Sequence, residues 1–418
     1  MKNKTIIIGC SSAFIIIVAL VSVAVWLFYS RFIEPFHALR TETPAELRDP
    51  RIITGDGFLA RTQFLTLPEP DFGARRGGIG PINDLVIKKT GDDSSTEIVI
   101  AGSYGALVVD QNGTNKSRVL YKLETQKEKI GFLKTTTTNS ILGDIEIVDL
   151  DGDHVFEYLA RGSIDGAAIF DNQGERLWAY GKFTEEKTSI EDMAAGDLDG
   201  DGVAELVVAW NGLEIFDRYG VNKWRQERDD GALHIEVVDT DGDGIKEIVY
   251  SRVGNLIIRD GKGRVVRGVD LPFYSGHFTL CTTPDKKQPA ILAVQDGYVW
   301  LTDFTGKTVA KFNAPLSELD TAPTQTPIGE LRGTSVYKAS GAWVKFKKGE
   351  PEYLAVIAKF AAVDRSLLYI YKSSGEIVYQ EVLPEQSSAM AIYPESNANN
   401  PQEVLIAGMK TIWRYKAR

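Results

Sequence analysis

Three acidic segments share the pattern D-x-D-G-D-x-x-x-E: Asp149-Leu150-Asp151-Gly152-Asp153-His154-Val155-Phe156-Glu157, Asp197-Leu198-Asp199-Gly200-Asp201-Gly202-Val203-Ala204-Glu205 and Asp239-Thr240-Asp241-Gly242-Asp243-Gly244-Ile245-Lys246-Glu247. Their first aspartates lie 48 and 42 residues apart. A short run of mixed polarity precedes each segment, and an apolar run such as Leu206-Val207-Val208-Ala209 follows it. This arrangement is typical of a strand, an acidic loop and a second strand.

A second repeated feature lies downstream of each acidic segment, where a hairpin pattern carries a glycine in its turn: Gly174, Gly220 and Gly263. Degenerate copies of both features place the start of a second strand near residues 97, 157, 205, 247, 289, 352 and 403, at intervals of 60, 48, 42, 42, 63 and 51. Propeller blades have about this length. The sequence therefore predicts an all-β fold, a seven-bladed β-propeller over residues 57–418. The two long intervals hold candidate insertions, Glu124–Thr138 and Ala314–Lys338, which are candidate contact surfaces.

The last copy of the repeat ends at Arg418 after its third strand. A blade that lacks its outer strand exposes an unpaired edge, so the strand must come from elsewhere in the chain. The segment Phe58–Leu67 precedes the first full copy. We expect this segment to supply the missing strand and close the ring.

The N-terminal region predicts a membrane anchor. Ile6–Tyr29 contains no charged residue and, as a helix, spans about 36 Å. The run is longer than the apolar part of a signal peptide and ends in bulky residues, so we expect an uncleaved anchor. Residues 1–4 are then a short cytoplasmic tail, 5–30 a single transmembrane signal-anchor helix and 31–56 a linker. Lys2 and Lys4 favour a cytoplasmic N-terminus, which places the propeller on the extracytoplasmic side of the cell membrane.

Carboxylates stand at positions 1, 3, 5 and 9 of each acidic segment and converge in a tight loop, where they repel one another unless a cation lies between them. Ca²⁺ fits better than Mg²⁺ because it accepts many oxygen ligands in flexible geometry. An EF-hand is excluded because position 12 is Ala160, Val208 or Tyr250 instead of glutamate. The alternative is plain Asp/Gly turns without metal. The predicted ligands are Asp149, Asp151, Asp153, Glu157, Asp197, Asp199, Asp201, Glu205, Asp239, Asp241, Asp243 and Glu247.

These segments resemble the FG-GAP/VCBS repeats of integrin-α-like propellers. The resemblance covers three of the seven copies, and His154 stands where the other two loops have Gly202 and Gly244. It implies structural calcium and a role at the cell surface in adhesion, in protein or carbohydrate binding, or as a scaffold.

We expect no enzymatic activity, because the sequence contains no G-x-S-x-G, H-E-x-x-H, P-loop or G-x-G-x-x-G motif. The four histidines are scattered, and the strand tryptophans are expected to pack between blades. The formal charge of −10 argues against nucleic acid as a partner. Cys10 lies in the apolar N-terminal run and is not expected to pair with Cys281.

One alternative comes from the turns Asp171–Trp178 and Asp217–Trp224, which resemble blades of pyrroloquinoline-quinone dehydrogenases. That resemblance implies a quinoprotein-like propeller, either an enzyme or an envelope assembly scaffold. Those enzymes usually have eight blades and a longer chain, whereas seven repeats are found here.

Overall fold

The computed structural model describes residues 43–418 except 69–77, 91–94, 121–126, 131–132, 137–141, 154, 163–165, 182–189, 211, 228–231, 233, 253–254, 274–277, 284, 286–287, 320–323, 327–328, 332–335, 361–362, 388 and 394–400. The tail at residues 1–4, the anchor at 5–30 and most of the linker therefore lie outside the described residues. Among the residues that are described, no helix has the length and apolar character needed to cross a membrane.

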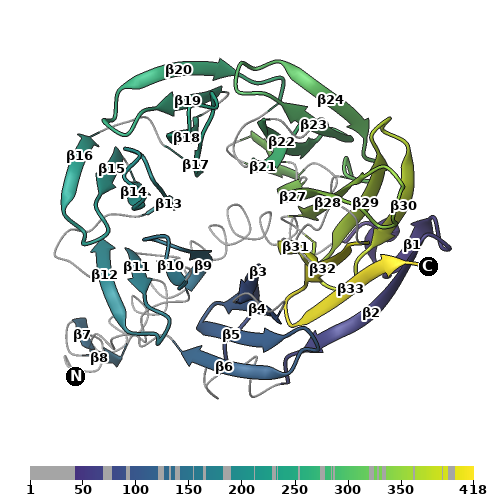
Figure 1. The fold of residues 1–418 in the computed structure, drawn as a ribbon, viewed down its shortest axis with the longest axis horizontal. Coiled ribbons are helices and arrows are strands. Elements are labelled where there is room, and N and C mark those ends of the chain that lie inside the picture. The colour runs from purple at the N-terminus through teal and green to yellow at the C-terminus, as the bar shows by residue number, and fades with distance from the viewer. Residues whose placement is uncertain are drawn as a thin grey trace, which may run out of the picture.

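Seven antiparallel sheets of four or five described strands are arranged as the blades of a ring, which confirms the predicted all-β, seven-bladed propeller (Figure 1). In blades 1 to 5 the first strand lies near the centre of the ring and the fourth lies at its periphery. Blades 1 to 4 each contain four strands that are consecutive in the chain: β3–β6 (Ile82–Thr90, Ser95–Gly102, Gly105–Asp110, Asn115–Leu120), β9–β12 (Leu142–Val148, Glu157–Gly162, Gly166–Phe170, Arg176–Gly181), β13–β16 (Asp192–Gly196, Glu205–Ala209, Gly212–Phe216, Asn222–Glu227) and β17–β20 (Ile235–Val238, Glu247–Arg252, Asn255–Arg259, Val265–Asp270).

Blades 5 to 7 complete the ring: β21–β24 (Thr279–Thr282, Pro289–Gln295, Tyr298–Thr302, Thr308–Asn313), β27–β30 (Val336–Val344, Tyr353–Phe360, Ser366–Lys372, Ile377–Val382) and β31–β33 (Ala389–Tyr393, Glu403–Ala407, Thr411–Ala417). Six of the seven expected second-strand starts lie in a second strand, and the remaining one, Glu352, directly precedes β28. The repeat spacing in the sequence therefore located the blades correctly.

Blade 7 is completed by β2 (Leu59–Thr66), which pairs antiparallel with β33 in the register Ala60↔Lys416. This confirms the predicted closure by Phe58–Leu67. The Arg61 guanidinium also forms an ion pair with the fully buried Glu381 of blade 6. The first and last parts of the propeller sequence are thus joined in one sheet.

The segment expected to be a linker also contributes to the ring. The 3₁₀-helix η2 (Ala45–Leu47) buries Leu47 completely, and β1 (Arg51–Thr54) pairs with β30 as a fifth strand of blade 6. Both elements lie within residues 31–56. The part of this segment that the structure describes therefore packs against the propeller.

The core is divided among the interfaces between blades. Second and third strands such as β14 and β15 are buried along their whole length, as continuous apolar runs predict, whereas outer strands such as β20 are mostly exposed. Seven hydrophobic clusters are found among the described residues, and each joins two neighbouring blades. Side-chain packing between sheets therefore holds the ring together.

Both predicted insertions contain a short two-stranded sheet outside the blade pattern. The first holds β7 (Lys127–Ile130) and β8 (Leu133–Thr136), and the second holds β25 (Thr324–Thr326) and β26 (Gly329–Leu331). A role for either insertion as a contact surface stays a prediction.

Candidate metal centre

The three acidic segments form the loops between the first and second strands of blades 2, 3 and 4. Because all three connect equivalent strands, they lie on the same face of the ring. Main-chain hydrogen bonds link neighbouring loops: Ala204 N–H donates to Leu150 O at 2.8 Å, and Lys246 N–H donates to Asp197 O at 3.2 Å. The loops thus form a continuous row across three blades.

The first aspartate of each loop organises the turn through its carboxylate. Oδ1 of Asp197 accepts the Gly200 N–H at 2.6 Å, and Oδ2 accepts the Gly202 N–H at 2.9 Å. Asp239 repeats both bonds at the same distances with Gly242 and Gly244. These glycines all have φ between 81° and 91°, the left-handed region that other residues rarely adopt. This explains why glycine recurs at both positions. His154, which replaces the second glycine in blade 2, lies outside the described residues.

The glutamate at position 9 begins the second strand and folds back over the loop. One oxygen of Glu205 accepts the Leu198 N–H at 2.9 Å, and one oxygen of Glu247 accepts the Thr240 N–H and hydroxyl, both at 2.8 Å. In blade 2 the Glu157 carboxylate accepts the Leu150 N–H at 3.1 Å. A carboxylate has two oxygens, and no described side chain pairs with the second oxygen of Glu157 or Glu247, whereas the second oxygen of Glu205 accepts a hydrogen bond from Lys223 Nζ at 2.6 Å.

Each loop gathers at least three carboxylates, one from each residue, with ligand oxygens within 4.8 Å of one another. The gathered sets are Asp149, Asp151 and Asp153 in blade 2, Asp197, Asp199 and Glu205 in blade 3, and Asp239, Asp241 and Glu247 in blade 4. Three predicted ligands, Glu157, Asp201 and Asp243, lie outside these sets. Asp201 and Asp243 instead each accept the main-chain N–H two residues further on at 2.8 Å.

The pKa values of the loop carboxylates are shifted in different directions. Burial raises the pKa of Asp197, but N–H donors from Gly202 and Gly200 outweigh it and hold that pKa below its usual value. The pKa of Asp239 is lowered in the same way, against burial, by Gly242 and Gly244. Burial raises the pKa of Glu247, and the neighbouring charges of Asp241 and Asp243 add to this. A cation near Glu247 would oppose both effects and favour the charged form.

Basic side chains approach two of the three loops. Lys223 Nζ of blade 3 lies 2.6 Å from Glu205 and 3.3 Å from Asp199, and so pairs with two of the predicted ligands. Arg218 reaches from blade 3 to Asp151 of blade 2 at 2.9 Å. Among the described residues, no lysine, arginine or histidine forms an ion pair with Asp239, Asp241, Asp243 or Glu247 of the blade 4 loop. The blade 4 loop therefore carries the least compensated negative charge of the three.

A second set of aspartates precedes the outer hairpin turns; the sequence pattern includes two of them, Asp171 and Asp217, but it did not predict their structural role. In each case one carboxylate oxygen accepts two main-chain N–H groups, as Asp217 does from Tyr219 at 2.9 Å and Val221 at 2.8 Å. The recurrence of aspartate three residues before each turn glycine was the available signal. The members are Asp110, Asp171, Asp217, Asp260 and Asp303. All five accept main-chain N–H groups of their own turn, and Asp260 and Asp303 also accept side-chain hydrogen bonds from Arg264 and Thr305, so these aspartates stabilise turns.

Of the four histidines, His234 is the one that the structure describes. It lies just before β17 and its Nδ1 is 2.6 Å from Asp192.

The predicted role of tryptophans between blades is confirmed for Trp178, whose ring centroid lies 5.2 Å from that of Phe216 in the next blade.

Comparison with known proteins agrees with the propeller fold. No protein-family model matches the chain. A rhamnogalacturonan endolyase, YesW of Bacillus subtilis, is 23% identical over 210 residues, which cover 41% of this chain and 32% of that protein. The chain thus spans about a third of the length of this relative.

Two solved structures match most of this chain at low sequence identity. BBS1N in complex with ARL6DN has a TM-score of 0.50 at 12% identity, covering 81% of this chain and 92% of that one. The Pan2 WD40 domain of Neurospora crassa has a TM-score of 0.49 at 12% identity, covering 86% of this chain and 96% of that one. At this identity the likeness concerns the fold alone.

Proposed function

We propose that this chain is a membrane-anchored, extracytoplasmic propeller that binds Ca²⁺ in its acidic loops and serves as a binding or adhesion platform for a protein or a carbohydrate. The observation that carries the proposal is the gathering of three carboxylates within 4.8 Å in each of three consecutive blades. The proposed ligand is Ca²⁺ because it takes six to eight oxygens at about 2.3–2.6 Å, so its ligand oxygens lie up to roughly 5 Å apart.

The proposed role of the metal is structural. Each loop joins two strands of one blade, and main-chain hydrogen bonds connect it to the loop of the next blade. A cation bound there would tie the first and second strands together and reduce the repulsion between carboxylates. Because it binds the folded loop, it would stabilise the propeller by mass action.

The anchor and the location rest on the apolar run at residues 5–30. Binding of a partner has two lines of support. BBS1N, which has a similar fold, was crystallised with the protein ARL6DN. The partial similarity to a rhamnogalacturonan endolyase supports carbohydrate as a second proposed class of ligand. Rigid propellers present loops on two faces around a central channel, which suits either class.

The test uses the purified full-length chain in detergent. Calcium is titrated by calorimetry, and thermal unfolding is followed in 1 mM EGTA and in calcium, with magnesium as the control ion. We expect calcium to bind and raise the melting temperature, and Asp197→Asn, Asp199→Asn and Asp241→Asn each to weaken binding. Equal melting temperatures in EGTA and calcium would overturn the proposal of structural calcium.

A further inference from the structure

The outer strands of the blades share one register position that faces the next blade. In blades 2 and 3 this position is held by Trp178, opposite Ile169, and Trp224, opposite Ile215. In blade 1 the equivalent residue is Ser117, opposite Val108. All three strand pairs have a register shift directly after this position, which makes the alignment unambiguous.

The two tryptophans fill the interface to the following blade. A Cβ placed on Gly220 of blade 3 would lie 1.8 Å from Trp178 Nε1, and one on Gly263 of blade 4 would lie 2.1 Å from Trp224 Cε2. An indole ring thus packs directly against the turn glycine of the next blade. Glycine is required at these turns because the ring occupies the space of a side chain.

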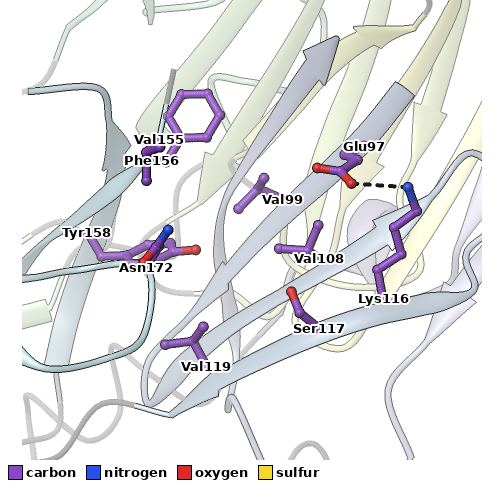
Figure 2. Close-up of a pocket in the computed structure, with 10 residues that line it drawn as sticks. All are labelled: Glu97, Val99, Val108, Lys116, Ser117, Val119, Val155, Phe156, Tyr158 and Asn172. Atoms are coloured by element: carbon purple, nitrogen blue, oxygen red, sulfur yellow. Dashed lines mark hydrogen bonds and ion pairs between the residues drawn. The ribbon is translucent and has the colours of Figure 1, made fainter. Parts of the chain in front are cut away.

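Ser117 is too small to fill the corresponding space between blades 1 and 2. A pocket of about 380 Å³ lies there, within the size range of ligand sites (Figure 2). Figure 2 shows residues of blade 1 on one wall and residues of blade 2 on the other. Apolar side chains and one tyrosine make up most of the lining: Val99, Val108 and Val119 from blade 1, and Val155, Phe156 and Tyr158 from blade 2.

The core at this interface is also thin. Its cluster consists of eight buried residues, of which Ala101, Ala106, Ala160 and Ala168 are alanines. Val99 and Tyr158 of this cluster also line the pocket, so the pocket continues outward from the core of this interface.

Polar groups lie around the apolar walls. Lys116 Nζ and a carboxylate oxygen of Glu97 form an ion pair at 3.0 Å, and both residues line the pocket together with Asn172. A buried indole N–H needs an acceptor, and the second oxygen of Glu97 or the Asn172 amide can provide one. The site thus combines an apolar cleft with hydrogen-bonding groups at its margin.

We infer that this pocket between blades 1 and 2 binds an aromatic side chain, a tryptophan above all, of a partner protein. The inference rests on the proposed role as a binding platform and names its site and partner chemistry. Two indoles of this chain, Trp178 and Trp224, occupy the equivalent position in the next blades, and this equivalence is the reason for assigning an indole to the pocket. Tryptophans in desolvated pockets commonly dominate the affinity of protein interfaces.

The test measures binding of N-acetyl-L-tryptophanamide to the full-length chain by saturation-transfer NMR and calorimetry. N-acetyl-L-alaninamide is the matched control, and methyl β-D-glucoside tests a sugar ring. We expect only the tryptophan compound to bind.

Ser117→Trp should lower the affinity for the tryptophan compound at least tenfold and leave the melting temperature unchanged or higher. The new side chain would fill the pocket as Trp178 fills the equivalent space between blades 2 and 3. Ser117→Ala should keep the binding, and Phe156→Ala should weaken it if Ser117→Trp fails to fold.

Several results would overturn the inference: no binding by the wild-type chain, wild-type affinity in both Ser117→Trp and Phe156→Ala, or binding of the glucoside in competition with the tryptophan compound. Measurements in calcium and in EGTA separate this inference from the proposed function. If calcium stabilises the chain but the tryptophan compound does not bind, only the inference about the pocket is contradicted. If the compound binds but calcium does not stabilise the chain, only the proposal of structural calcium is contradicted.

Discussion

At the scale of single residues, Lys223 distinguishes the blade 3 loop from the blade 4 loop. Its ammonium group lies within 3.3 Å of Asp199 and Glu205 and so competes with a metal for their charge. We expect Lys223→Met to tighten calcium binding by the blade 3 loop about three- to tenfold, the effect of removing one partly exposed charge. Calorimetry in a background with Asp151→Asn and Asp241→Asn, which weaken the other loops, measures this site alone.

The matched control is Lys116→Met. Lys116 has the same register position in blade 1 and pairs with Glu97, but its loop lacks the alternating aspartates. This variant should leave calcium affinity unchanged. If Lys223→Met binds calcium no more tightly than the unchanged chain, the ammonium does not compete with the metal.

Gly220 gives a second prediction for one residue. It has φ +82°, and an added Cβ would collide with Trp178. Gly349 has nearly the same φ, +80°, with nothing within 4 Å of an added Cβ. We expect Gly349→Ala to lower the free energy of unfolding by about 1–2 kcal/mol, the strain of the left-handed backbone alone. Gly220→Ala should cost about 2–5 kcal/mol because steric overlap is added. Denaturant unfolding checks both, and equal losses would mean that the Trp178 contact contributes nothing.

At the scale of elements, β1 and β2 make different contributions although they are neighbours in the chain. β2 completes a blade that would otherwise have three strands, whereas β1 adds a fifth strand to a complete blade. Deletion of Phe58–Leu67 should therefore abolish cooperative unfolding, and deletion of Arg51–Thr54 should preserve it at a lower melting temperature. Calorimetric scans of both variants test this. A cooperative transition after loss of β2 would show that the closure is dispensable.

The same two strands show what could be predicted from sequence. The need for β2 was evident because the repeat ends one strand short, so a missing partner could be inferred from counting. β1 has the short sequence Arg51-Ile52-Ile53-Thr54, with no repeat signal, and its partner β30 lies more than three hundred residues away. Only tertiary packing reveals it.

In the acidic loops, too, some features could be predicted from sequence and others could not. Their alternating aspartates are adjacent in sequence, so their convergence could be predicted from spacing. Lys223 comes from the outer strand of the blade, and its approach to Glu205 depends on how the strands pair. The pocket at Ser117 could not be predicted from sequence either, because it depends on the strand register that makes Ser117 equivalent to Trp178 and Trp224.

At the scale of the whole molecule, a charged cluster links three blades. Arg161 of blade 2 lies 3.9 Å from Asp192 of blade 3, and Asp192 contacts His234, next to the first strand of blade 4, at 2.6 Å. Glu236 lies 3.3 Å from the other ring nitrogen of His234. Burial lowers the pKa of His234, but the carboxylates of Asp192 and Glu236 outweigh it and raise the pKa to about 10. Against its own burial, Asp192 has a lowered pKa because of His234 and Arg161. The imidazolium thus holds neighbouring blades together by charge.

This cluster makes the stability of the ring depend on pH with a defined sign. The folded-state pKa of His234 lies above its unfolded value of about 6.5, so its stabilising effect is complete below pH 6.5 and is lost as the pH rises toward 10. We expect the free energy of unfolding to fall across this window by up to about 1.4 kcal/mol per pH unit, the limit for one proton. His234→Gln should be less stable at pH 6.5 and should remove this part of the slope, so that the two chains converge near pH 10. Urea unfolding from pH 6 to 10 in EGTA, which excludes metal effects, provides the measurement. Parallel profiles for the two chains would mean that His234 does not carry its charge in the folded ring.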